Sequence, residues 1–375
     1  MTDSTPLPDF TSLPDLAVRT LGGSVIAASD ESFAEKENLL NPWEPEFSPA
    51  TFGRKGQVYD GWETARRRGP GHDWALVRLG MPGVVRGVVI DTAWFKGNYP
   101  PHASVEACAV DGHPADLSGV DWTEIVPKSP LKGDSAHAFP VRLERLSTHV
   151  RLNMFPDGGV ARLRVHGDVV PDPRYMTGLT VDLAALENGA RVVECSDGFY
   201  SSPDNMLFPG LARNQAEGWE TARRRDGGND WAVIRLAAPG AIRLAEIDTA
   251  HLKFNAPAQA ALSGLDARED GGRRPLLPRT GLLPAARHRI RVCSPVARRA
   301  GAGAVLLVGT YRPDGLSRRH PAAEALLRIE RRHTVTHVRL DIYPDGGVSR
   351  LRLLGDLSPD AERTLTARWR RLGGG

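Results

Sequence analysis

Cysteine is scarce in this sequence. Among 375 residues there are three, Cys108, Cys195 and Cys293, and they stand far apart in the chain. Such spacing forms neither a CxxC pair nor a cysteine–histidine ligand set, so the sequence indicates neither a disulfide framework nor a structural zinc site. This usage is typical of a reducing compartment, and we expect a cytoplasmic protein.

The sequence also lacks the features of secreted and membrane proteins. Residues 1–15 are polar and proline-rich, without the basic and apolar regions of a signal peptide, and are predicted to form a flexible leader. Apolar runs fall short of the roughly 20 residues that cross a bilayer. We therefore expect neither secretion by that route nor a membrane partner.

A strong charge of either sign is missing as well. There are 48 basic and 45 acidic residues, which give a formal net charge of +3. Near-balance does not predict a basic surface for nucleic acid. Two arginine triplets, 66–68 and 223–225, are short and lie beside acidic residues, so they favour solvated or small-anion roles.

An internal repeat is the main feature that is present. Residues 60–68 read DGWETARRR and residues 217–225 read EGWETARRR. A later block, THVRLNMFPDGGVARLR at 148–164, returns as THVRLDIYPDGGVSRLR at 336–352, identical at 13 of 17 positions. The length of the chain suits two domains, and the repeat predicts that they share one fold.

Strands are the predicted elements of both copies. Gly 39 and Pro 29 with aromatics at 6% favour many turns and short strands. Pro82-Gly83 and Pro239-Gly240 predict turns that separate strands 73–79 from 84–92 and 230–236 from 241–249. Residues 321–333 (PAAEALLRIERRH) predict a short helix. The pattern predicts an all-β protein of two tandem antiparallel β-sandwiches. The run DWALVRL, the Pro-Gly turn and VVRGVVIDT resemble the jelly-roll modules of the galactose-binding-like superfamily, which implies two tandem jelly-roll domains.

The predicted domain boundaries follow the repeat. They are 16–168 for the first repeat, 169–188 for a linker, 189–356 for the second repeat and 357–375 for a C-terminal tail. The second repeat is longer because of an Arg-, Ala- and Gly-rich insertion at about 290–325, which predicts an inserted lobe or a mobile excursion.

Several strings, taken in order, resemble the allantoicase family. They are DGWETARRR, GHDW, DTAWFKGNYPPHASVEAC at 91–108, LLPRTGLLPAARH at 276–288 and the doubled FPDGG/YPDGG. The resemblance covers about 21–356. It implies two jelly-roll repeats, hydrolysis of allantoate to ureidoglycolate and urea in purine catabolism, and a homo-oligomer. A tandem binding module for a carbohydrate or another small polar ligand, without catalysis, is the alternative.

The chemistry of that reaction selects candidate residues. Allantoate carries one carboxylate and two ureido groups on a single carbon. Release of urea breaks a carbon–nitrogen bond there, so the leaving nitrogen needs a proton donor and water needs a base. Arginine can hold the carboxylate with two hydrogen bonds, while Asn, Asp and Glu suit the ureido groups.

The catalytic candidates are His102, Glu106 and Asp91. The candidate substrate-binding residues are Glu63, Arg66, Lys96, Asn98, His251, Lys253 and Asn255. Structural roles compete: Asp91 as a turn cap, Glu106 as a solvated strand residue, Glu63 as the partner of an arginine. His102 and Glu106 share one side of a strand, but two ligands do not define a metal site, so the metal is unknown and a divalent ion stays open.

The two copies differ in ways that favour the first for catalysis. Residues 251–255 read HLKFN where the family has an HFKGN-type loop, so that Phe254 stands at the place of Gly97. A glycine permits close backbone approach or positive φ, which phenylalanine disfavours. Ser263 stands at the place of Glu106, so the second copy lacks that carboxylate. Trp62 and Trp219 are predicted to be packing residues.

Overall fold

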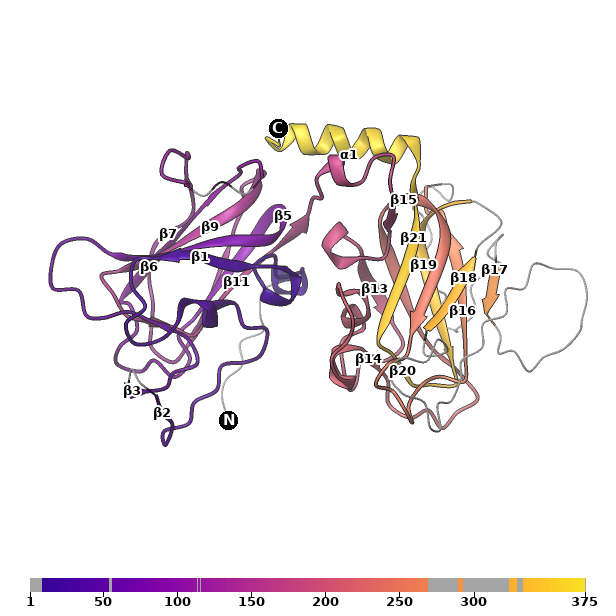
Figure 1. Cartoon of the computed structure of the whole chain (residues 1–375), viewed down its shortest axis with the longest axis horizontal. Helices are drawn as coiled ribbons and strands as arrows, with labels where there is room; N and C mark the ends of the chain where they lie inside the picture. The colour runs from indigo at the N-terminus through magenta and orange to yellow at the C-terminus, as the bar shows by residue number, and fades with distance from the viewer. Residues whose placement is uncertain are drawn as a thin grey trace, which may run out of the picture. The chain divides into compact units, whose positions relative to one another are not determined.

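The computed structural model describes residues 9–53, 56–112, 114, 116–268, 289–292, 324–328 and 333–374. It divides into two compact units, one of Met1–Asp172 with Thr366–Gly375 and one of Pro173–Leu365 (Figure 1). The boundary between Asp172 and Pro173 falls inside the predicted linker, 169–188. In the described part of the chain, no helix is long and apolar enough to span a membrane.

The first unit is built almost entirely of strands. They are β1 (Ser24–Ala28), β2 (Phe52–Gly53), β3 (Gly56–Gln57), β4 (Trp62–Glu63), β5 (Asp73–Asp91), β6 (His102–Cys108), β7 (Thr123–Pro130), β8 (Ala136–Pro140), β9 (Leu146–Phe155), β10 (Gly159–Val160) and β11 (Arg162–Val169). Three short 3-10 helices accompany them: η1 (Asp9–Ser12), η2 (Arg19–Leu21) and η3 (Lys36–Leu40).

The second unit repeats this plan. Its strands are β12 (Thr180–Asp182), β13 (Arg191–Cys195), β14 (Trp219–Glu220), β15 (Asp230–Asp248), β16 (Gln259–Leu265), β17 (Arg289–Val292), β18 (Glu324–Arg328), β19 (Thr334–Tyr343), β20 (Gly347–Val348) and β21 (Arg350–Leu357). Its helices are η4 (Pro173–Tyr175), η5 (Leu186–Asn188), η6 (Pro203–Leu207), η7 (Gln215–Glu217) and the start of α1 (Pro359–Arg371).

One long strand joins the two layers of each sandwich. The first half of β5 pairs with β1 and β9, and its second half pairs with β11 and β8. The predicted turn at Pro82-Gly83 is wrong, because β5 runs through it, and β15 likewise runs through Pro239-Gly240. Glycine serves close approach instead: a Cβ on Gly83 would lie 2.5 Å from the Asp168 carbonyl oxygen.

The predicted helix at 321–333 is also wrong. Residues 324–328 form β18, which pairs with β15 as β8 pairs with β5. Pairing with a neighbouring strand overrides the local helix propensity of this segment. Most of the insertion at about 290–325 lies outside the described residues, apart from 290–292 in β17 and 324–325 in β18.

Near the start of each repeat an aspartate side chain accepts a hydrogen bond from the backbone of the last strand of that repeat. Asp15 accepts a hydrogen bond from the Val165 backbone N–H at 2.9 Å, and Asp182 accepts one from the Leu353 N–H at 2.9 Å. Asp182 belongs to β12, which pairs with β21. Residues 180–182 of the range predicted as a linker are therefore part of the second sheet.

The C-terminal segment contributes to the core of the first unit. Trp369 and Leu372, which are 7% and 5% exposed, form one buried cluster with Val84, Leu146 and Val170. The Leu146 N–H also donates to the Leu372 carbonyl at 3.0 Å. The range predicted as a tail thus supplies an α-helix and two core side chains.

Candidate active site

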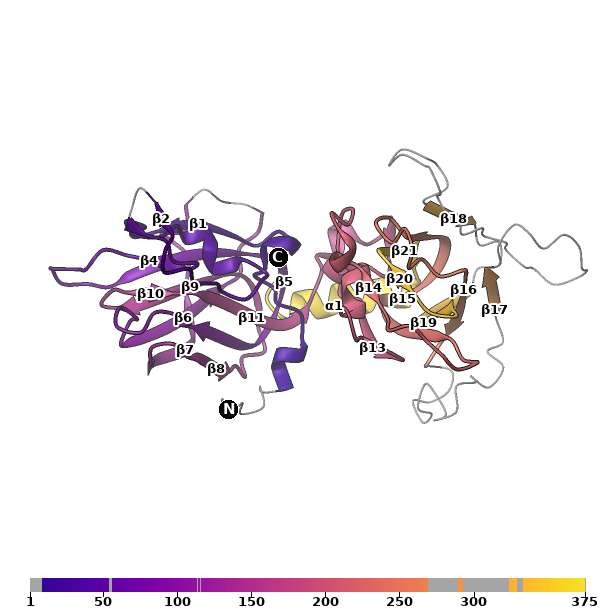
Figure 2. The same ribbon diagram turned by 90° about the horizontal axis from the view of Figure 1, so that it is seen from below.

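The duplicated WETARRR stretch lies at the loop end of each sandwich. β4 pairs with β10 and β14 pairs with β20. All four strands are labelled in the turned view (Figure 2). Trp62 and Trp219 are fully buried, which confirms their predicted packing role. Each indole N–H donates at 2.8 Å to a backbone carbonyl, of Asp30 or Asp197. The same short strand therefore presents a glutamate in each repeat.

Carboxylates from two other loops fix the backbone of this stretch. In the first repeat Asp30 accepts from the Ala65 N–H at 2.6 Å, and Asp157 accepts from the Arg67 N–H at 2.8 Å. The second repeat has the same two bonds, to Asp197 and Asp345, at 3.1 and 2.7 Å. The Pro-Asp-Gly-Gly turns are thereby tied to the WETARRR loops.

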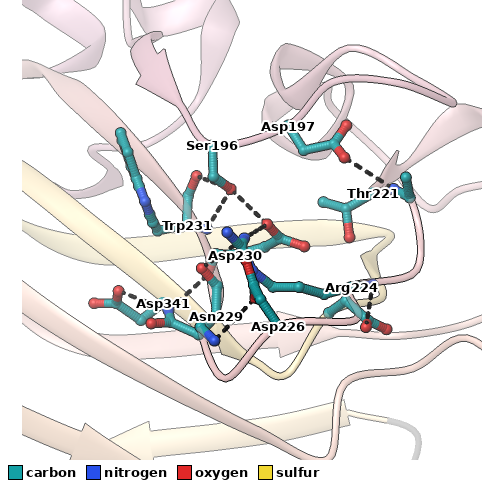
Figure 3. A network of polar contacts seen from close by, with 12 residues as sticks. Ser196, Asp197, Thr221, Arg224, Asp226, Asn229, Asp230, Trp231 and Asp341 are labelled. Carbon is teal, nitrogen blue, oxygen red and sulfur yellow. Dashed lines mark hydrogen bonds and ion pairs between the residues drawn. The ribbon is translucent and has the colours of Figure 1, made fainter. Parts of the chain in front are cut away.

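The middle arginine of each triplet is committed to an ion pair. Arg67 donates to Asp73, which is 2% exposed, and Arg224 donates to Asp230 (Figure 3). A serine hydroxyl also donates to each aspartate, from Ser29 to Asp73 at 3.0 Å and from Ser196 to Asp230 at 2.9 Å. The flanking Arg66 is exposed. Because Asp73 holds Arg67, the exposed Arg66 is the more available of these two arginines to a ligand.

Glu63 and Asn98, both predicted to bind substrate, are brought together. The Asn98 side-chain amide donates to Oε1 of Glu63, and the Gly159 N–H holds the Asn98 carbonyl at 2.7 Å. Glu63 is half-buried. Burial raises the pKa of its carboxyl, and the Asn98 hydrogen bond opposes that rise. A carboxyl of this kind is suited to proton transfer.

The same pair recurs in the second repeat. The Asn255 amide donates to Oε1 of Glu220, and the Gly347 N–H holds the Asn255 carbonyl at 2.8 Å. The predicted lysines flank both pairs at exposed positions. Lys96 lies 3.7 Å from Asp134, and the Lys253 Nζ lies 5.5 Å from the centroid of the Phe254 ring.

Asp91, a catalytic candidate, caps a turn. Its Oδ1 accepts from the Ala93 N–H at 2.8 Å, and Asp248 accepts from the Ala250 N–H at 2.7 Å in the second repeat. Burial raises the pKa of both carboxyls. Because the arrangement is duplicated and local, it accounts for both aspartates as turn-forming residues.

His102 and Glu106 lie on one side of β6, as predicted. Their positions pair with Phe155 and Arg151 of β9 in a regular register. His102 is exposed at the start of the strand, whereas Glu106 accepts hydrogen bonds from Arg151 at 2.7 Å and Asn153 at 2.9 Å. The structure therefore joins Glu106 to β9 and not to His102.

His251 and Trp94 share a role that the sequence did not reveal. Both have positive φ, 66° and 70°. The His251 Nε2 lies 2.9 Å from the Ala212 carbonyl oxygen, and the Trp94 indole donates at 2.8 Å to the Pro45 carbonyl. Each side chain thus anchors a neighbouring loop. The chemical difference between tryptophan and histidine hid the equivalence.

The expected conformational need for Gly97 is wrong. It is absent from the positive-φ glycines of the described chain, and a Cβ added to it would meet open space. Phe254, at the equivalent place, is 86% exposed. The two loops therefore tolerate either residue, and this substitution does not separate the repeats chemically.

Stacked aromatic side chains beside the first pair were also missed. Ring centroids are 5.1 Å apart for Phe47 and Tyr59, 5.8 Å for Phe47 and Trp94, and 5.2 Å for Tyr59 and Phe95. They pack the proline-rich loop before β4 against the loop that carries Asn98. Four aromatic residues within that loop, at 43, 47, 52 and 59, were the available signal. Within the described ranges, no group of three or more His, Cys, Asp or Glu could hold a metal.

Comparison with known proteins decides the family. The allantoicase repeat model matches residues 14–170 and 181–358. The chain belongs to the allantoicase family. A probable allantoicase of Nocardia farcinica is 53% identical over 352 residues, which cover 93% of this chain and 95% of that protein. One from Streptomyces avermitilis is 47% identical over 97% of this chain and 91% of its own.

Solved allantoicase structures share the fold. The crystal structure of allantoicase from Saccharomyces cerevisiae is 31% identical with a TM-score of 0.67, over 92% of this chain and 93% of that one. Another allantoicase structure is 34% identical with a TM-score of 0.68, over 91% and 92%. The prediction of two jelly-roll repeats is confirmed. Each allantoicase repeat of this chain contains one glutamate–asparagine pair.

Proposed function

We propose that this chain hydrolyses allantoate to ureidoglycolate and urea, with Glu63 as the group that transfers the proton. Membership of the allantoicase family supports the reaction. The observation that carries the site is the half-buried Glu63 carboxyl, whose pKa is raised by burial and whose Oε1 is held by Asn98. It lies on a loop fixed by Asp30 and Asp157.

The proton transfers follow from that geometry. The Glu63 carboxyl gives its proton to the leaving ureido nitrogen while the carbon–nitrogen bond breaks and urea departs. The oxygen of one water molecule bonds to the same carbon. The proton that this water loses restores the Glu63 carboxyl, so the enzyme returns to its starting state.

Asn98 and two cations complete the proposed binding site. The Asn98 amide orients the Glu63 carboxyl by holding one oxygen. Arg66 lies three residues after Glu63 and Lys96 two residues before Asn98, both exposed. Their charges suit the substrate carboxylate, for which arginine offers two parallel donors.

A urea-release assay tests the reaction and the site together. Wild-type chain incubated with allantoate is expected to give urea and ureidoglycolate. Glu63→Gln removes the transferable proton and is expected to lower kcat by about 10²- to 10⁴-fold. A wild-type chain that releases no urea, with or without added divalent metals, would exclude the reaction and favour the binding-module alternative.

Arg66→Lys tests carboxylate recognition, with Arg68→Lys as the matched exposed control. Loss of the bidentate fork is expected to raise KM at an unchanged melting temperature, whereas the control stays at the wild-type value. Equal KM values in all three proteins would remove Arg66 from the site.

The other candidates form a second proposal. Catalysis by His102, Glu106 and Asp91 with binding by His251, Lys253 and Asn255 is tested by alanine or amide substitution at each position. Large losses of kcat at His102 with unchanged Glu63→Gln activity would favour that set. We also propose that the protein is cytoplasmic, since the cysteine usage suits a reducing compartment. We further propose a homo-oligomer, as the family resemblance implies, and light scattering on the purified chain measures its size.

A further inference from the structure

The two glutamate–asparagine pairs differ in one hydrogen bond. In the second repeat the Gln215 side-chain amide donates to Oε2 of Glu220 at 2.7 Å, while Asn255 donates to Oε1. Glu220 is 8% exposed. Both of its oxygens are therefore occupied by amide donors of the same repeat.

In the first repeat a valine, Val58, stands at the position of Gln215. Val58 stands four residues before Trp62, as Gln215 stands four residues before Trp219. A valine side chain has no hydrogen-bonding group, and Val58 is 45% exposed. Among the residues that the structure describes, Asn98 is the one side chain that donates to Glu63, through Oε1.

Buried arginines show that Asp60 and Glu217 hold equivalent positions. Arg162, 1% exposed, donates to the Asp60 carbonyl at 2.8 Å, and Arg350, 4% exposed, donates to the Glu217 carbonyl at 2.6 Å. The backbone two residues before each tryptophan is therefore held alike. Further from the tryptophan the backbones differ, because Gln215 begins the 3-10 helix η7, whereas the Val58 N–H donates to the Thr51 carbonyl at 3.0 Å.

We infer that the Gln215 amide blocks the Glu220 carboxylate of the second repeat. Each chain then has one proton-transferring glutamate, Glu63, and one allantoate site. The inference rests on the proposed function. The leaving ureido nitrogen can approach Oε2 of Glu63, whereas the Gln215 amide occupies Oε2 of Glu220. Displacing the Gln215 amide would break an existing hydrogen bond to a carboxylate oxygen.

Matched amide substitutions test the division of roles. Glu63→Gln is expected to lower kcat by about 10²-fold or more, and Glu220→Gln to leave kcat within about threefold of wild type. Melting temperatures identify a variant that fails to fold. Equal losses in both variants, with melting temperatures no lower than that of wild type, would overturn the inference while leaving the reaction intact.

Binding stoichiometry provides a second measurement that does not require turnover. Calorimetric titration of Glu63→Gln with allantoate is expected to give one site per chain. Gln215→Val, at an exposed position, removes the second donor and is expected to add a weaker site in the same background. Two sites before Gln215 is changed, or no new site after it, would overturn the inference; a wild-type chain without urea release would instead overturn the proposed function.

Discussion

Arg151 and Arg339 occupy the same position in the two repeats, but their carboxylate partners come from different strands. Arg151 on β9 pairs with Glu106 on β6, and Arg339 on β19 pairs with Asp341 two residues along the same strand. Each guanidinium also lies over a tryptophan ring, at 4.7 and 4.6 Å from the centroid. In the second repeat Ser263 stands at the place of Glu106, and Asp341 supplies the carboxylate that pairs with the arginine.

Exchanging these arrangements tests whether the carboxylates are interchangeable. Asn153 is the counterpart of Asp341, and Ser263 that of Glu106. Glu106→Ser alone leaves Arg151 without its carboxylate and is expected to lower stability by about 1–3 kcal/mol. Adding Asn153→Asp is expected to restore most of it. Urea unfolding measures both, and no recovery in the double variant would contradict the exchange.

The arginine triplet offers a matched test of structural commitment. Arg67→Ala leaves the buried Asp73 carboxylate without its cation and is expected to cost about 3 kcal/mol. Arg66→Ala removes an exposed side chain and is expected to stay within about 0.5 kcal/mol of wild type. Denaturant midpoints compare them, and equal losses would show that Arg66 is also structural.

The sequence predicted the pattern of the fold better than its turns. The repeat and the alternating apolar residues predicted the two sandwiches, because burial on one side imposes a period of two on a strand. It did not distinguish a turn at Pro82-Gly83 from a strand that changes neighbours, since both need glycine. That distinction depends on the approach of β11, which lies far away in the chain.

The candidate site shows the same limit. Glu63 and Asn98 were selected by residue type alone, and their contact depends on a loop that pairing of β4 with β10 brings close. Asp91 and His251 are the polar types that a site needs, but hydrogen bonds to backbone groups occupy them. A sequence shows which side chains have suitable chemistry. It does not show which of them already form hydrogen bonds with backbone groups in the folded chain.

Ionisation of Glu63 is expected to cost stability. Its pKa is raised in the folded chain, so its contribution is present below the unfolded pKa and is lost as pH rises through the folded pKa. Glu63→Gln avoids that loss. We expect its melting temperature to exceed that of wild type at pH 8 and to approach it at pH 4. A variant that is less stable at pH 8 would contradict the raised pKa.

Cys108 is expected to resist alkylation. It is 5% exposed, and burial raises the pKa of its thiol to about 11. At pH 8 iodoacetamide should therefore modify the Cys108 peptide far more slowly than the Cys195 peptide, as read by mass spectrometry. Unfolding in urea should equalise the two rates. Rapid native labelling of Cys108 would show that β6 opens readily.

The Trp369 side chain is expected to stabilise the first unit. Trp369→Ala empties a buried cluster with Val84 and Val170 and is expected to cost about 3–5 kcal/mol. Arg370→Ala, on the exposed side of α1, is the control. Differential scanning calorimetry should show one lowered transition. An unchanged transition would mean that the cluster is dispensable.

The position of Trp369 and Leu372 also affects how the protein is made. Domains generally fold from the N-terminus as the ribosome delivers them. Here the first sandwich needs side chains from the last ten residues before Leu146 and Val84 are fully covered. Its apolar face therefore stays open throughout translation of the second repeat, and a nascent chain stalled before Trp369 would be a target for chaperones.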